Sequence, residues 1–162
     1  MEYLEHIKSK IVSLEGLACK RAYWNLKEQP VVFTNGCFDI LHRGHIEYLS
    51  KAADLGKVMV IGLNSDSSVK RIKGESRPIQ DEYTRALVLA SLEFVSAVVL
   101  FDEDTPYELI KATQPDILVK GADYKHEDIV GYDIVTQRGG SVVTIEFVEG
   151  FSTTSIINKL NK

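Results

Sequence analysis

The 162-residue chain is 44% apolar and 26% charged, which is the size and composition of one globular domain with a full hydrophobic core. Its net charge of −4 argues against general binding to nucleic acids or membrane surfaces, so a small ligand is expected. The N-terminus lacks the apolar core of a signal peptide, and the apolar runs are too short to cross a bilayer, so we expect a cytoplasmic protein. Two cysteines without a CxxC motif predict no disulfide framework.

Residues 2–28 precede the first expected strand and carry apolar residues at helical spacing. They predict one or two helices, of which the second is capped by Ser13 and stopped by Pro30. We expect residues 1–29 to form a helical extension to a domain of residues 30–162. The sequence leaves open whether this extension packs on the domain or forms a subunit contact.

From residue 31 onward, apolar runs typical of strands alternate with helical patterns. Strands are expected at residues 31–34, 57–63, 96–101, 116–120 and 141–147. Helices are expected at residues 44–55, 81–92, 106–113, 126–138 and 153–161, with a long loop at 64–80. Thr105 as an N-cap, Pro106 as the first helical residue and Glu108 as a capping-box acid predict a helix start, and Gly139-Gly140 predicts a helix end. The alternation predicts a Rossmann-like, doubly wound α/β fold, in which helices cover both faces of a five-stranded parallel sheet.

The segment VVFTNGCFDILHRGHIEYL, residues 31–49, combines a buried strand, a turn and the start of a helix. His42 and His45 are three residues apart, so both imidazoles lie on one face of that helix. Gly44 between them leaves room beside backbone N–H groups that point outward from a helix start. The segment is therefore suited to bind an anion. Zinc is not expected, because neither an HExxH motif nor a nearby cysteine pair completes a site.

Ligands of open parallel sheets bind beyond the carboxyl ends of the strands. Four stretches follow those ends, and all are polar or rich in glycine: residues 34–45, 64–79, 120–124 and 149–155. The second concentrates cations in an acidic chain, namely Lys70, Arg71, Lys73 and Arg77. On composition alone, this cluster is equally typical of a solvated loop. Neither GxGxxG nor GxxxxGK[ST] occurs, which argues against a dinucleotide oxidoreductase and a P-loop NTPase.

Two motifs resemble the signatures of the cytidylyltransferase-like nucleotidyltransferases. TNGCFDILHRGH resembles the first, in which HxGH opens the first helix, and VEGFSTTSII resembles the second, in which a Ser-Thr pair begins the last helix. The blocks GLNSDSSVKRIKG, SRPI, VVLFDEDTPYELI and LVKGADY are similar to the heptose 1-phosphate adenylyltransferase domain of ADP-heptose synthases. The resemblance covers about residues 30 to 160. It implies transfer of AMP from ATP to a D-glycero-D-manno-heptose 1-phosphate for a cell-surface glycan such as lipopolysaccharide core.

The resemblance also implies roles for individual residues. His42, His45 and Lys73 are expected to be catalytic, with the histidines donating hydrogen bonds to phosphate oxygens. Nucleotide binding is expected at Asn35, Gly36, Cys37, Phe38, Gly44, Arg85, Lys120, Gly121, Asp123, Glu149, Ser152, Thr153 and Thr154. The sugar phosphate is expected at Asp39, Asn64, Asp66 and Arg77. Mg²⁺ is expected on the phosphates of ATP, without a metal site in the protein. Relatives are commonly oligomeric, which implies a homo-oligomer, most simply a dimer.

Several of these residues also have ordinary structural explanations. Cys37 is more simply a small residue packed in the turn than a nucleophile. Arg85 can form an exposed ion pair with Asp81, a plausible helix cap, and Ser152 can be an N-cap. Which lysine of residues 70–73 reaches the triphosphate is open. Rival functions are a cytidylyltransferase for glycerol 3-phosphate or a related alcohol phosphate, and a nucleotide-binding regulator without catalysis.

Overall fold

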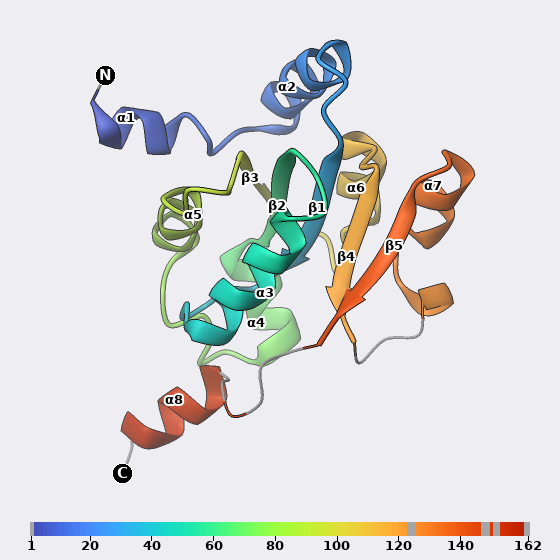
Figure 1. Cartoon of the computed structure of the whole chain (residues 1–162). Coiled ribbons are helices and arrows are strands. Elements are labelled where there is room, and N and C mark those ends of the chain that lie inside the picture. The colour runs from blue at the N-terminus through green and yellow to red at the C-terminus, as the bar shows by residue number, and fades with distance from the viewer. Residues whose placement is uncertain (1, 123–125, 147–149, 151–152, 161–162) are drawn as a thin grey trace.

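The protein forms one five-stranded sheet (Figure 1). The structure, a computed structural model, describes residues 2–122, 126–146, 150 and 153–160. The strands are β1 Val31–Gly36, β2 Val58–Asn64, β3 Ala97–Phe101, β4 Ile117–Gly121 and β5 Ser141–Ile145. Their order across the sheet is β3-β2-β1-β4-β5, and every adjacent pair is parallel. The predicted α/β, Rossmann-like fold class is confirmed.

Helices cover both faces of the sheet and lie around its ends (Figure 1). The first half of the chain forms α1 Tyr3–Lys8, α2 Leu14–Leu26, α3 Arg43–Ala53, α4 Asp66–Lys73 and α5 Glu82–Ala90. The second half forms α6 Tyr107–Thr113, a 3₁₀ turn at His126–Asp128, α7 Tyr132–Gln137 and α8 Thr153–Leu160. Among the described helices, none is both long and apolar enough to span a membrane.

Alternate strand residues pack into two hydrophobic cores, one on each face of the sheet. Val31 and Phe33 of β1 join residues of α2, α6 and α7 in the first core. Val32 points to the opposite face and joins residues of α3 and α5 in the second core. All three side chains are fully buried. The strands are therefore continuous apolar runs, because helices exclude water from both faces.

The N-terminal extension packs against the rest of the chain. Leu17 and Trp24 of α2 are buried within the first core. Ser13 caps α2, as the sequence predicts, by accepting a hydrogen bond from a backbone N–H of the first turn. Ile11 forms an isolated parallel bridge with Val98 of β3. Of the two possibilities that the sequence leaves open, the structure shows packing on the domain.

The long loop expected at residues 64–80 is wrong, because this stretch contains α4. Ser65 caps the helix by accepting a hydrogen bond from the backbone N–H of Ser68, and Val69 is its one fully buried apolar side chain. With two apolar residues in eight, Val69 and Ile72, the helix has an apolar pattern too short to distinguish it from a polar loop. Its cap and its contacts with the sheet stabilise it instead.

Two further helix predictions need correction. The helix expected at residues 126–138 is split, because Gly131 has φ of 89°, a left-handed conformation that interrupts helical hydrogen bonding before α7. Thr105 is not an N-cap, because α6 begins after Pro106 and lacks a side-chain cap. The predicted end of α7 is confirmed, since Gly139 follows it with φ of 78°.

Candidate functional site

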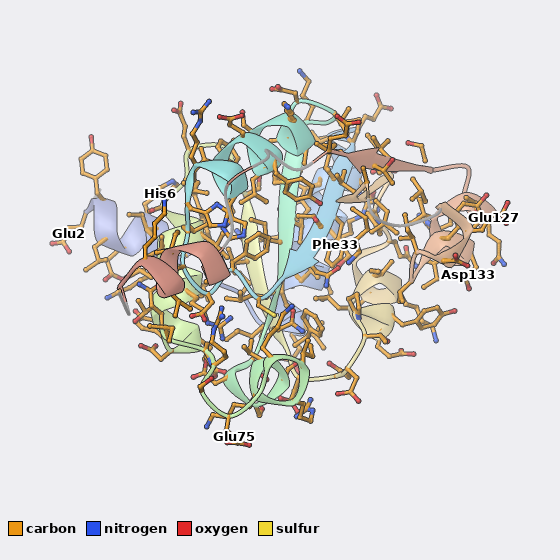
Figure 2. The ribbon with its side chains drawn as sticks, turned by 90° about the horizontal axis from the view of Figure 1, so that it is seen from below. Glu2, His6, Phe33, Glu75, Glu127 and Asp133 are labelled. Carbon is orange, nitrogen blue, oxygen red and sulfur yellow. The ribbon has the colours of Figure 1, made fainter. Side chains whose placement is uncertain are left out.

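The carboxyl ends of β1 and β4 lie side by side at the centre of the sheet, where the strand order reverses. From this point the chain continues to β2 and β3 on one side and to β5 on the other, which is the position where open parallel sheets bind ligands. The Lys120 ammonium of β4 donates a hydrogen bond to the Asn35 side chain of β1 and joins the two strands. Figure 1 shows α4 and α8 beyond these strand ends, and Figure 2 views the same edge directly.

His42 is the N-cap residue of α3 and has extended backbone angles. Its Nδ1 atom accepts a hydrogen bond from the backbone N–H of His45, with 3.4 Å between the two nitrogens. A ring that accepts at Nδ1 carries its proton on Nε2 when it is neutral. The local structure therefore makes Nε2 of His42 a hydrogen-bond donor.

His45 lies in the first turn of α3, where its ring packs against the Phe38 ring in a T-shaped arrangement with 5.3 Å between the centroids. Burial, the larger cause, and the neighbouring His42 together lower the pKa of His45 to about 4, against the opposite effect of the Ile40 backbone. Its Nδ1 atom is buried and has no partner in hydrogen-bonding geometry among the described residues. The ring is consequently neutral at physiological pH, and it can donate a hydrogen bond without adding positive charge.

Tyr48 is a residue near the site that the sequence interpretation missed. It follows His45 by three residues on α3, and its hydroxyl lies 2.9 Å from the Thr34 hydroxyl of β1. Both side chains are buried. This hydrogen bond fixes the first turns of α3 against the end of β1. The recurring spacing of three residues from His42 to His45 to Tyr48 is the signal that identifies it.

Asp39 lies directly after the turn that follows β1 and is only 2% exposed. Its carboxylate accepts hydrogen bonds from the backbone N–H groups of Ile79 (2.7 Å) and Gln80 (3.0 Å). It also forms an ion pair with the Arg77 guanidinium, with 2.5 Å between Oδ2 and Nε. Two residues expected to bind the sugar phosphate, Asp39 and Arg77, thus contact each other.

Arg85 has a fully buried side chain, and each of its three guanidinium nitrogens donates to a protein oxygen. Nε donates to the Gln80 carbonyl (3.0 Å), Nη1 to the Cys37 carbonyl (2.6 Å) and Nη2 to the Asp66 carboxylate (2.8 Å). The alternative of an exposed ion pair with Asp81 is wrong, because Asp81 instead caps α5. Arg85 of α5 thus contacts the turn after β1 and the first turn of α4.

The pKa of the Cys37 thiol depends on burial and on the charges near the turn after β1. Burial raises its pKa above the ordinary value, while the charges of Lys73, Arg85 and Arg77 lower it, Lys73 most strongly of the three. A thiol with a raised pKa is mostly protonated at neutral pH and is a poor nucleophile. This agrees with the explanation of Cys37 as a packed residue, and Lys73 is near enough for its charge to act on the thiol.

The other expected residues lie around the same edge. Asn64 ends β2 and donates to the Ser68 hydroxyl (3.0 Å), and Gly36 ends β1, where a Cβ atom would come within 3.0 Å of the Phe38 ring. Gly44 and Gly121 are buried at the start of α3 and the end of β4, and Thr153 begins α8. The expected residues Asp123, Glu149 and Ser152, and the side chain of Thr154, lie outside the described part of the chain. Within that part, no cluster of three or more His, Cys, Asp or Glu side chains could hold a metal ion.

Comparison with known proteins gives the family. A family model described as cytidylyltransferase-like matches residues 33–159. Bifunctional protein HldE of Campylobacter jejuni subsp. doylei is 60% identical over 134 residues, which are 83% of this chain and 28% of that protein. Bifunctional protein HldE of Citrifermentans bemidjiense is 53% identical over 152 residues, which are 94% of this chain and 31% of that protein. The chain therefore spans less than a third of the length of these relatives.

Two solved structures are also similar. The lipopolysaccharide core biosynthesis protein from Thermoplasma volcanium GSS1 has a TM-score of 0.59 and 28% identity, over 74% of this chain and 97% of its own. Pantoate-beta-alanine ligase from Francisella tularensis has a TM-score of 0.62 over 93% of this chain and 77% of its own, but at 17% identity it shares the fold alone. The family match includes both signature motifs and most of the sheet. The chain belongs to the cytidylyltransferase-like family of nucleotidyltransferases.

Proposed function

We propose that the chain transfers AMP from ATP to D-glycero-D-manno-heptose 1-phosphate, which yields ADP-heptose and pyrophosphate. The observation that carries the transfer chemistry is the pair of neutral imidazoles, His42 and His45, at the start of a helix beside the strand-order reversal. The choice of sugar phosphate is supported by the SRPI and LVKGADY blocks. It is supported further by similarity to HldE proteins and to a lipopolysaccharide core biosynthesis protein.

The proposed reaction is one in-line displacement at the α-phosphorus of ATP. An anionic oxygen of the sugar phosphate forms the new P–O bond while the bond from the α-phosphorus to its bridging oxygen breaks. Pyrophosphate leaves with the electron pair. Because the nucleophile is already ionised, no general base is required, and the protein contributes positioning and charge stabilisation. ATP enters as its magnesium complex, so the metal belongs to the substrate.

In this mechanism, His42 and His45 donate hydrogen bonds to phosphate oxygens whose negative charge grows in the transition state. The low pKa of His45 supports this role, because the ring stays neutral at physiological pH and still carries one N–H group that it can donate. The hydrogen bond that His42 Nδ1 accepts supports donation from its Nε2. Both donors are fixed before the substrate arrives, because α3 holds their backbone.

We propose that Lys73 contacts the triphosphate. It is the last residue of α4, its side chain is exposed to solvent, and its charge acts on the Cys37 thiol beside β1. In contrast, Arg71 of the same helix is paired with Asp104, with 3.0 Å between Nε and Oδ1. This difference favours Lys73 among the cations of α4. Gly121, Asp123, Glu149, Ser152, Thr153 and Thr154 would complete the nucleotide site in this proposal.

The test is pyrophosphate release by the purified protein with Mg²⁺. ATP and CTP are each combined with the heptose 1-phosphate anomers and with glycerol 3-phosphate. Release with ATP and a heptose 1-phosphate only is the expected result, and it identifies the anomer. Release with CTP and glycerol 3-phosphate would overturn the substrate assignment, and nucleotide binding without any release would favour a regulator.

We also propose that the protein is a cytoplasmic homodimer. Light scattering on the purified protein measures the number of subunits.

A further inference from the structure

We infer that Asp39 and Arg85 are positioning residues that together hold Gln80 and thereby fix residues 73–77, here called the basic segment, beside the paired histidines. This inference rests on the proposed function, because it concerns how the transfer site is arranged. It assigns to Asp39 and Arg85 a role different from the direct substrate contact that the family resemblance implies. Asp39 is 2% exposed and Arg85 is 1% exposed, so a bound phosphate could reach little of either side chain.

Asp39 and Arg85 both form hydrogen bonds with the main chain of Gln80. The Asp39 carboxylate accepts the Gln80 N–H, and Arg85 Nε donates to the Gln80 carbonyl, each at 3.0 Å. A residue held at both its N–H and its C=O is fixed in position and in rotation. The two hydrogen bonds are charge-assisted and partly buried, which makes them stronger than exposed neutral ones.

The same two residues also anchor both ends of the chain that carries the basic segment. At its start, Arg85 Nη2 donates to Asp66 in the first turn of α4. At its end, Asp39 pairs with Arg77 and accepts the N–H of Ile79. Asp39 belongs to the first signature motif and directly follows the turn after β1, so the far end of the segment is fixed relative to the residues that precede the histidines.

Between these anchors the basic segment has few contacts of its own. Residues 73–76 are exposed, and Gly74 has φ of 97° with nothing within 4 Å of where a Cβ would lie. Figure 2 shows Glu75 pointing outward at the rim of the molecule. The path of residues 74–77 therefore depends on what holds its two ends, namely α4, which carries Lys73, and the contacts of Asp39, rather than on packing within the segment.

The first test measures amide hydrogen exchange without any nucleotide or sugar. In Asp39→Asn the neutral side chain is a weaker acceptor, and its NH₂ group opposes the Arg77 guanidinium. We expect the amides of Ile79 and Gln80 to exchange roughly tenfold faster, as loss of hydrogen bonds to a charged group implies. Glu75→Gln removes the same charge from an exposed position of the basic segment and should leave those rates unchanged.

Unchanged exchange in Asp39→Asn would overturn the inference, because a residue that only contacts substrate has no effect on the free protein. Amides of the core strand β2 must keep wild-type rates, which separates local release from general unfolding. Arg85→Lys provides a second variant, because a single ammonium cannot serve the three acceptors that the guanidinium contacts. It should release the same amides.

The second test is a double-mutant cycle on the KM for ATP, measured by pyrophosphate release. If Asp39 acts through the basic segment, Asp39→Asn should have a much smaller effect in a Lys73→Ala background than in the wild type. Full additivity of the two substitutions would overturn the inference. Absence of turnover in the wild-type protein would instead overturn the proposed function, while faster exchange in Asp39→Asn would still support the positioning role.

Discussion

The imidazole rings of His42 and His45 lie stacked, with their centroids 3.8 Å apart and their planes 19° from parallel. Two rings in this arrangement cannot both be protonated without strong repulsion. Burial lowers the pKa of each ring, and the His42 charge lowers the pKa of His45 further. The pair is therefore a fixed, uncharged set of hydrogen-bond donors rather than a cationic site.

The first prediction concerns His45 as a donor to the transition state. His45→Ala should lower turnover on the order of 10²-fold or more, because a preorganised donor to the developing charge is lost. His6→Ala, on the exposed helix α1, is the control and should keep wild-type turnover. Pyrophosphate release measures both, and thermal unfolding checks that the fold is intact. Wild-type turnover in His45→Ala would remove the central role of the pair.

The second prediction concerns stability below neutral pH. The pKa of His45 is about 4 in the folded protein and near 6.5 in the unfolded chain, so the unfolded state binds more protons between these values. The contribution of this neutral ring to the free energy of unfolding is fully present above pH 6.5 and is lost as the pH falls towards 4. The loss is at most about 3 kcal/mol, and solvent near the ring reduces it.

The variant His45→Asn, which cannot be protonated in this range, isolates the effect of the ring. Denaturant unfolding at several pH values should show that the wild type loses more stability than the variant between pH 6.5 and 4. Parallel pH dependence of the two proteins would show that the ring is not buried in a neutral state.

The third prediction uses Cys37 to locate Lys73. Because the Lys73 charge lowers the pKa of the thiol, Lys73→Ala should raise that pKa further and slow the alkylation of Cys37 at a fixed pH. Lys70→Ala removes a charge of the same sign one turn earlier on α4 and is the matched control. Both variants carry Cys19→Ser, and mass spectrometry follows the peptide that contains Cys37. Equal slowing by both substitutions would contradict the assignment of Lys73.

The fourth prediction concerns the attachment of the N-terminal extension. Arg21 of α2 is 6% exposed and donates to the carbonyls of Thr113 (3.1 Å) and Gln114 (2.9 Å) at the end of α6. Arg21→Ala leaves these acceptors without their charged donor and should lower the free energy of unfolding by about 3 kcal/mol. Lys20→Ala, one residue earlier, should have a much smaller effect. Denaturant titration measures both, and equal losses would contradict the buried role of Arg21.

Local sequence patterns were sufficient for the sheet and for both ends of several helices. The strands were predictable because burial on two faces demands uninterrupted apolar residues, as in β1. Helix α4 was missed because it buries Val69 fully and little else that is apolar, and because the polar residues around Ser65 also suit a loop. The split before α7 depends on the backbone angle of Gly131, which a glycine permits but does not require.

The candidate site was predictable to a different degree. His42 and His45 belong to one short motif, so their proximity follows from helical spacing. Arg85 is different, because its acceptors come from segments up to 48 residues away in sequence. A charged residue on a surface helix is normally exposed, and its complete burial is explained by acceptors from the neighbouring Gln80 and from two more distant segments. No pattern within a single segment contains that information.

The pairing of residues 10–12 with β3 has a consequence for behaviour in solution. The Val98 N–H donates to the Lys10 carbonyl (2.8 Å), and the Val98 carbonyl accepts from the Val12 N–H (3.0 Å). These bonds lie on the outer side of β3, which is otherwise an open edge of the sheet. An uncovered edge strand is a template for pairing with other chains and for aggregation. Residues 10–12 thus cover part of this edge, and they hinder a strand of another molecule from pairing with β3 there.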